Sequence, residues 1–214
     1  MLHCRNSPDF PMPGAIGGLC PWLDLTHSLP SWHLNRKECI LPDASNDPIY
    51  TTPMRSHLYV DHNRQLVLPS VSPIFAAETT PICPVMLHIG ACDRLRDDSL
   101  YFATQTFTNS PIGVEIYQGR AHVFQLFAPF SEFSKTSLKR LGSFLHEQTG
   151  RQTKRSVFEA RTLFVSNSSG FPISEVDANA ILVAGIAQLI RDGTWVLGNE
   201  GEIVKSVQVG HAKF

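Results

Sequence analysis

The sequence predicts an α/β protein built around a mostly parallel sheet, and three observations indicate this fold class. In the second half of the chain, apolar runs of strand length alternate with amphipathic segments of helical period, which is the order of β-α-β units. The hydrophobic fraction of 43% is enough for a buried core, and the charged fraction of 17% is too low for a disordered chain. The length of 214 residues suits one domain of ordinary size.

The first half of the chain predicts one strand followed by a long irregular connection. Residues 14–25 (GAIGGLCPWLDL) form a short apolar run opened by glycine, which is typical of a buried parallel strand near 14–20. Residues 27–72 then mix proline, serine, asparagine and histidine with short apolar pieces. A connection of this length is usually functional, or it contains short helices that periodicity does not resolve.

The second half opens with a strand, a helix and a second strand. Residues 84–90 (PVMLHIG) predict a buried strand, and residues 112–117 (IGVEIY) predict the next one. Between them, Asp97 and Asp98 are expected to cap a helix that runs to Phe107. This order favours parallel neighbours and a right-handed connection.

Two further helices follow along the chain. Ser131 opens a strongly amphipathic helix that is expected to end at Gly150. Residues 151–170 are polar and basic with no clear period, so they predict a loop or linker. Residues 174–177 (SEVD) resemble a capping box and open a helix that runs to about Arg191. The remaining C-terminal residues are expected to form a loose strand or a tail.

Charge and cysteine usage exclude several classes of protein. The 18 basic and 19 acidic residues give a formal net charge of −1, which gives no support for nucleic-acid binding, and the only basic cluster is the short one of Lys154, Arg155 and Arg161. The five cysteines are scattered, as expected of reduced thiols rather than of a disulfide framework. The sequence has neither a signal-peptide core nor an apolar stretch long enough to span a bilayer. A cytoplasmic location is therefore expected unless an upstream segment is missing, and no motif indicates a cofactor or a metal site.

Two polar side chains follow the predicted strands and form the candidate site. Asp93 comes shortly after the strand at 84–90, and His122 follows the strand at 112–117. Adjacent parallel strands lie about 5 Å apart, so an aspartate and a histidine at their ends can meet. A carboxylate that hydrogen-bonds a histidine fixes its tautomer and stabilises the imidazolium formed during proton transfer. The two residues are therefore a candidate acid and general base.

Four segments carry a resemblance to a known family. In chain order they are GAIGGLCPWLDLTHSLPS, SPIFA, PVMLHIGACDRLRDDSLYFATQ and YQGRAHVFQLF. Their sequence and order over about residues 11–147 resemble the hormone-sensitive-lipase-like esterases and lipases, a family of α/β-hydrolases. The order acid then histidine also fits the order serine, acid, histidine of these enzymes.

The resemblance implies a partial α/β-hydrolase fold, made of the C-terminal strands of a mostly parallel sheet with flanking helices. Residues 1–150 are then the C-terminal part of the hydrolase domain, and residues 151–214 are a linker, a helix and a tail packed on or beside it. The implied function is hydrolysis of small-molecule carboxylic esters. By the same resemblance Asp93 is the triad acid, His122 is the general base, and Asp97 is a second, structural acid.

The departures from the family pattern are equally informative. No H-G-G-G oxyanion loop, G-D-S-A-G-G elbow or other G-x-S-x-G motif occurs in the chain, so it is expected to lack the nucleophile and to be inactive alone. Cys20 stands where the family commonly has serine, and Val123 stands where glycine often follows the histidine. Since the absent motifs belong upstream, the strand near 14–20 is expected to expose an edge that promotes oligomers or aggregates.

Two alternatives remain open from the sequence. A protein that kept the scaffold after losing the nucleophile would be a non-catalytic, α/β-hydrolase-like interaction protein. A different enzyme would use Cys20 or Cys92 as its nucleophile, although neither cysteine lies in the strand–turn–helix elbow that such chemistry needs.

Overall fold

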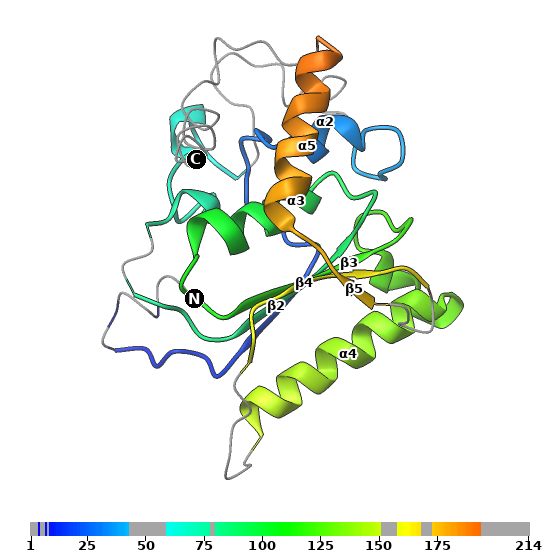
Figure 1. The fold of residues 1–214 in the computed structure, drawn as a ribbon. Coiled ribbons are helices and arrows are strands. Elements are labelled where there is room, and N and C mark those ends of the chain that lie inside the picture. Colours follow the sequence, from blue (N-terminus) through cyan, green and yellow to red (C-terminus); the bar gives the residue numbers. More distant parts are fainter. Residues whose placement is uncertain are drawn as a thin grey trace.

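The structure, a computed structural model, describes residues 9–42, 59–77, 80–150, 158–167 and 173–193, together with Cys4 and Ser7. Its centre is a five-stranded sheet in the spatial order β1-β2-β3-β4-β5 (Figure 1). The strands are β1 (Ile16–Leu19), β2 (Val85–Gly90), β3 (Ile112–Tyr117), β4 (Thr162–Val165) and β5 (Ile173–Glu175). β1 to β4 are parallel, and β5 is antiparallel to β4. The predicted α/β fold and the parallel pairing of its first three strands are confirmed.

Helices cover both faces of this sheet. The described α-helices are α2 (Pro30–Leu34), α3 (Arg96–Tyr101), α4 (Glu132–Thr149) and α5 (Ala178–Arg191). α4 lies along one face of the sheet, whereas α3 and α5 lie on the opposite side (Figure 1). The largest apolar core includes Ile89, Leu100, Val114 and Leu182, which come from β2, α3, β3 and α5.

The strand register places the C-terminal ends of β2 and β3 side by side. Val85 pairs with Ile112 and Gly90 with Tyr117, so the two strands begin and end level with each other. β3 is buried along its whole length and β2 nearly so, because helices cover both faces of the sheet. The residues that follow these strands therefore emerge next to each other at one edge of the sheet.

The helix after β2 begins differently from the sequence prediction. α3 starts at Arg96, so Asp97 and Asp98 lie in its first turn, and the prediction that they cap the helix was wrong. Both carboxylates are buried and accept backbone N–H groups from a distant segment, which the local sequence does not reveal. α3 continues as a π-helical turn, η5 (Phe102–Thr106), which ends one residue before the predicted helix end at Phe107.

The prediction of a loop or linker over 151–170 was wrong where β4 lies. A four-residue strand is too short to show a period, and β4 is specified by its pairing with β3. The capping-box prediction was also wrong, because residues 174–175 belong to β5. The N-cap of α5 is Asp177, whose carboxylate accepts the N–H of Asn179 at 2.8 Å. The division of the chain at residue 150 stays a prediction.

Short helical turns complete the described chain. α2, η3 (Asn63–Gln65) and η4 (Pro73–Phe75) lie in or beside the connection that the sequence predicts to be irregular. η6 (Phe124–Phe130) follows the loop that comes after β3. The strand or tail predicted after α5 lies outside the described residues. Within the described ranges, no helix combines the length and apolarity needed to cross a membrane.

Candidate active site

Asp93 and His122 come together beyond the C-terminal ends of β2 and β3, as the sequence predicts. Nδ1 of His122 lies 3.2 Å from Oδ2 of Asp93. The Asp93 side chain is fully buried, and 16% of the His122 side chain is exposed. A partly exposed imidazole that is held by a carboxylate can take up and return a proton. The contact is observed, whereas the catalytic role of the pair stays a prediction.

Backbone hydrogen bonds join the two loops that carry the pair. The N–H of Ala91 donates to the carbonyl of Tyr117, and the N–H of Cys92 donates to that of Arg120, both at 2.9 Å. Gly90 permits this approach, because a Cβ atom there would lie only 2.1 Å from the Arg120 carbonyl oxygen. These backbone hydrogen bonds therefore hold the two loops close together.

Further contacts orient the Asp93 carboxylate. Its Oδ1 atom accepts the backbone N–H of Leu95 at 2.9 Å, and Sγ of Cys39 lies 3.8 Å from the same oxygen. The Asn35 side-chain amide donates to the Asp93 carbonyl at 2.7 Å. Because Oδ1 is occupied, Oδ2 is the oxygen that faces His122, and this favours one orientation of the imidazole ring.

Other aspartates hold the segment after β1 against the start of α3. Oδ2 of Asp98 accepts the backbone N–H groups of Leu23 and Asp24 at 3.0 and 2.9 Å. Oδ2 of Asp97 accepts the N–H of Ser31 at 2.8 Å. Burial raises the pKa of Asp98 well above its usual value, and the nearby charge of Asp24 raises it further. Sequence reasoning named Asp97 as a structural acid but missed Asp98 and Asp24, which no local pattern distinguished from capping or turn residues.

Cys20 is a neighbour of the pair that the sequence did not place there. One ligand-type atom each of Cys20, Asp93 and His122 lies within 4.8 Å of the other two. Burial raises the pKa of the Cys20 thiol far above its usual value, and the charge and hydrogen bond of Asp93 raise it further. A thiol that stays protonated is a poor nucleophile, which argues against the hypothesis of a Cys20 nucleophile.

Two residues beside the pair have a left-handed backbone. Cys20 has a φ of 47°, and Val123, which directly follows the histidine, has a φ of 45°. A β-branched residue in this region is strained by about 1–2 kcal/mol. In the hormone-sensitive-lipase-like family that the sequence resembles, glycine often occupies the position of Val123. A glycine would adopt this conformation without strain. Strain of this kind is frequent at functional sites.

A second histidine–carboxylate pair lies in the middle of the same two strands. His88 of β2 and Glu115 of β3 are register partners, and Nε2 of His88 is 3.3 Å from Oε2 of Glu115. Nδ1 of His88 is 2.9 Å from the hydroxyl of Ser137 on α4. Arg140 and Tyr117 donate hydrogen bonds to the Glu115 carboxylate. Burial lowers the pKa of His88 to about 4, so this histidine is neutral at neutral pH.

This second pair has the chemical order serine, histidine, glutamate, yet it is sealed inside the protein. The exposed fraction is 0% for Ser137 and His88 and 2% for Glu115. A substrate cannot reach a hydroxyl that is buried between a helix and a sheet. We therefore interpret the cluster as a structural link between α4 and the sheet.

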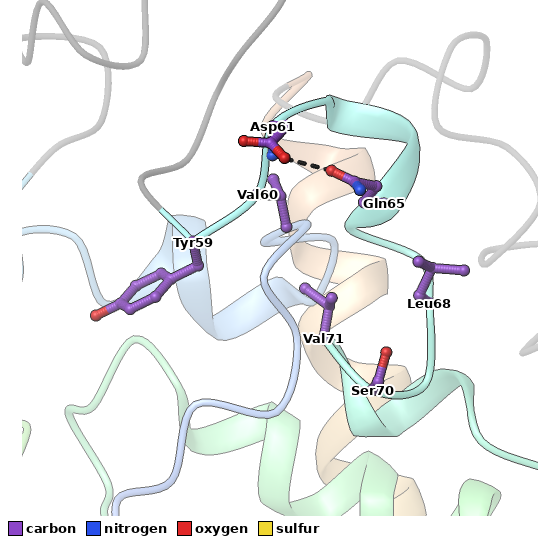
Figure 2. Close-up of a pocket in the computed structure, with 7 residues that line it drawn as sticks. All are labelled: Tyr59, Val60, Asp61, Gln65, Leu68, Ser70 and Val71. Carbon is purple, nitrogen blue, oxygen red and sulfur yellow. Dashed lines mark hydrogen bonds between the residues drawn. The ribbon is translucent and has the colours of Figure 1, made fainter.

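Hollows lined by other described residues lie away from the pair. The described residues that line one cavity, of about 280 Å³, all belong to the segment 59–71, as Figure 2 shows. A second cavity, of about 400 Å³, is lined by Trp22, Leu25, Tyr59, Ser70 and Val71. Neither Asp93 nor His122 lines either cavity, so neither hollow brings a ligand directly against the pair.

The fold is similar to solved structures of esterases and lipases. A hormone-sensitive lipase from a metagenome library matches with a TM-score of 0.59 and 24% identity, over 69% of this chain and 48% of its own. EstE7, a hormone-sensitive-lipase homologue from a metagenome library, matches with a TM-score of 0.58 and 25% identity, over 69% and 49%. An esterase/lipase from an uncultured bacterium matches with a TM-score of 0.57 and 23% identity, over 69% and 47%. The expected partial α/β-hydrolase fold is therefore confirmed.

The chain spans about half the length of the solved structures that it matches. No family model matches its sequence, and no curated protein matches it either. The structural similarity establishes the fold, and the activity has to be argued from the site.

Proposed function

We propose that Asp93 and His122 are the acid and the general base of a carboxylic ester hydrolase that uses a serine nucleophile. The observation that carries this proposal is the 3.2 Å contact between Nδ1 of His122 and Oδ2 of Asp93. The contact lies at the ends of neighbouring parallel strands, where catalytic residues gather in open α/β sheets. The same fold occurs in solved esterases and lipases.

In the proposed reaction, the serine belongs to the part of the hydrolase that corresponds to the unmatched half of the solved structures. Nε2 of His122 removes the serine proton as the hydroxyl attacks the ester carbonyl, and the imidazolium then protonates the leaving alcohol. Asp93 accepts the hydrogen bond of Nδ1–H, which keeps Nε2 unprotonated before the attack and stabilises the imidazolium afterwards. Backbone N–H groups from the same part as the serine hold the oxyanion.

We further propose that residues 1–214 alone do not turn over esters. The sequence contains neither the serine elbow nor the oxyanion loop of the resembling family. Loss of triad members costs about 10⁴–10⁶ in rate, and each oxyanion donor contributes about 10²–10³. These losses are not additive, but either one reduces activity to background. β1 ends the described sheet on one side, and we expect its edge to promote oligomers or aggregates.

A comparison of the chain with a chimera tests both proposals. In the chimera, the part of EstE7 that this chain does not span is fused to residues 14–214. The chain alone should not hydrolyse p-nitrophenyl butyrate above the buffer rate, whereas the chimera should. A chimera that unfolds cooperatively but has no turnover would contradict the proposed ester hydrolase. Hydrolysis by the chain alone that disappears with His122→Ala would contradict its proposed inactivity.

A further inference from the structure

The cluster of Cys20, Asp93 and His122 also has the chemistry of a metal site. A thiolate, a carboxylate oxygen and an imidazole nitrogen are the three kinds of ligand that bind zinc in proteins. A thiol that is protonated in the metal-free protein releases its proton to solvent when the ion binds it. Here one atom of each kind lies within 4.8 Å of the other two. We propose that this cluster binds a zinc ion, with three protein ligands and a fourth position for water. The proposal rests on the cluster's geometry and does not depend on ester hydrolysis.

The distances between the ligand atoms require little adjustment. In a tetrahedral site with zinc–nitrogen and zinc–oxygen distances of about 2.0–2.1 Å, the nitrogen and the oxygen lie about 3.3 Å apart. Nδ1 of His122 and Oδ2 of Asp93 are 3.2 Å apart. A zinc–sulfur distance of about 2.3 Å places the sulfur about 3.5 Å from both atoms. The ligand atoms that the three residues offer lie within 4.8 Å of one another, so the Cys20 sulfur has to approach its two partner atoms by no more than about 1.3 Å.

The surroundings of the cluster resemble those of protein metal sites. Oδ1 of Asp93 is held by the N–H of Leu95 at 2.9 Å, which leaves Oδ2 for the ion and fixes the carboxylate plane. Cys20 is only 3% exposed and Asp93 is fully buried. The 16% exposure of the His122 side chain provides an entry path for the ion and a place for the bound water.

The ligand set favours zinc over the hard cations. Magnesium and calcium prefer oxygen ligands in sets of six or more, whereas a thiolate and an imidazole suit zinc. The ion would occupy Nδ1 of His122 and Oδ2 of Asp93, the two atoms that otherwise contact each other. Zinc binding and the hydrogen bond between Asp93 and His122 are therefore mutually exclusive, so the ion acts as an inhibitor of any proton transfer by the pair.

Cobalt substitution in the full chain tests this site. The metal-free chain is titrated with Co²⁺, whose bond to a cysteine sulfur gives a near-ultraviolet charge-transfer band and whose visible bands report tetrahedral geometry. Cys20→Ser is nearly isosteric and should abolish the charge-transfer band. Cys39→Ser is the matched control, because its Sγ lies 3.8 Å from Oδ1 of Asp93 but outside the cluster. We expect Cys20→Ser to weaken zinc binding at least about 100-fold, since even outer-shell partners contribute about 10–100-fold.

Each outcome of the titration either supports the zinc site or overturns it. A charge-transfer band in the wild type and in Cys39→Ser, displaced by Zn²⁺ and absent in Cys20→Ser, supports the site. No band in the wild type, or a band that persists in Cys20→Ser, overturns it. An equal loss in Cys39→Ser overturns the three-ligand assignment. Near-ultraviolet circular dichroism verifies that each variant is folded. Since Cys20→Ser leaves both members of the Asp93–His122 pair in place, this result is independent of hydrolysis by the chimera.

Discussion

Two histidine–carboxylate pairs join β2 to β3, and they differ in where they lie along the strands. His88 and Glu115 face each other in mid-strand, whereas Asp93 and His122 follow the strands at their C-terminal ends. The mid-strand histidine has no exposed surface, and the strand-end histidine side chain is 16% exposed. Both pairs combine a histidine with a carboxylate, so their position in the sheet decides which one is accessible from outside the protein.

The mid-strand pair also differs in how the charge of its carboxylate is balanced. Burial alone would raise the pKa of Glu115, but the hydrogen bonds and charge of Arg140 bring it below its usual value. Glu115 is therefore ionised and paired with Arg140, while burial keeps His88 neutral at neutral pH. The mid-strand cluster thus contains a buried carboxylate whose charge is compensated by Arg140, so removal of either partner is destabilising. It contains no group that is poised to exchange a proton with a substrate.

The largest difference between the two pairs is expected in kcat, when the carboxylate of each pair is replaced by its amide. In the chimera, Asp93→Asn should lower kcat about 10⁴-fold, because an amide no longer favours the productive histidine tautomer. Glu115→Gln should leave kcat within about tenfold, since it acts only on the buried cluster. Steady-state hydrolysis of p-nitrophenyl butyrate measures both effects. Equal losses in the two variants would remove the functional distinction between the pairs.

The same substitutions should have the opposite order of effect on stability. Glu115→Gln should lower the free energy of unfolding by about 2–3 kcal/mol, below the full value for a buried pair because Arg140 is partly exposed. Asp93→Asn should cost about 1 kcal/mol, because the amide oxygen can still accept the N–H of Leu95. Urea unfolding of the chimera at neutral pH measures the difference. A larger loss in Asp93→Asn would show that the strand-end pair is the structural one.

The buried histidine should also make stability depend on pH. Because the folded-state pKa of His88 is about 4 and its usual value is 6.5, the unfolded state binds more protons between these values. The free energy of unfolding is therefore not reduced by His88 above pH 6.5. It decreases as the pH falls towards 4, by about 3 kcal/mol in total. Unfolding curves between pH 7 and 4 should show this decline, and His88→Gln should reduce its slope by about 1 kcal/mol per pH unit. An unchanged slope in His88→Gln would contradict the assignment.

The smallest effect is expected for the buried serine. Ser137→Ala removes the hydroxyl that lies 2.9 Å from Nδ1 of His88 and should lower the free energy of unfolding by about 1 kcal/mol. It should leave ester hydrolysis by the chimera unchanged, because substrate does not reach Ser137. A marked fall in kcat with normal stability would instead indicate that the serine–histidine–glutamate order of this cluster is catalytic.

The strand-end pair could be predicted from the sequence, whereas the mid-strand pair could not. Asp93 and His122 follow apolar runs, so the ends of the strands were visible without a structure. His88 and Glu115 lie inside such runs, and the register that makes them partners is set by contacts between distant segments. The position of Cys20 beside the pair could not be predicted for the same reason. No local pattern shows where β1 ends relative to β2.

The missed elements have a similar physical origin. β4 has four residues, and its place in the sheet comes from pairing with β3 rather than from its own period. Asp98 resembled a helix cap in the sequence, but its carboxylate accepts N–H groups from the segment after β1. Long, strongly periodic elements such as α4 were predicted to within a residue of their ends, because their own apolar pattern and caps determine them.

The most direct test of the proposed acid–base pair compares its histidine with the buried one. In the chimera, His122→Ala should lower kcat for p-nitrophenyl butyrate by about 10⁴–10⁶-fold without loss of cooperative unfolding. His88→Gln, measured where it is fully folded, should keep kcat within about tenfold of the parent. A chimera that retains its activity after His122→Ala, or loses it only after His88→Gln, would contradict the account.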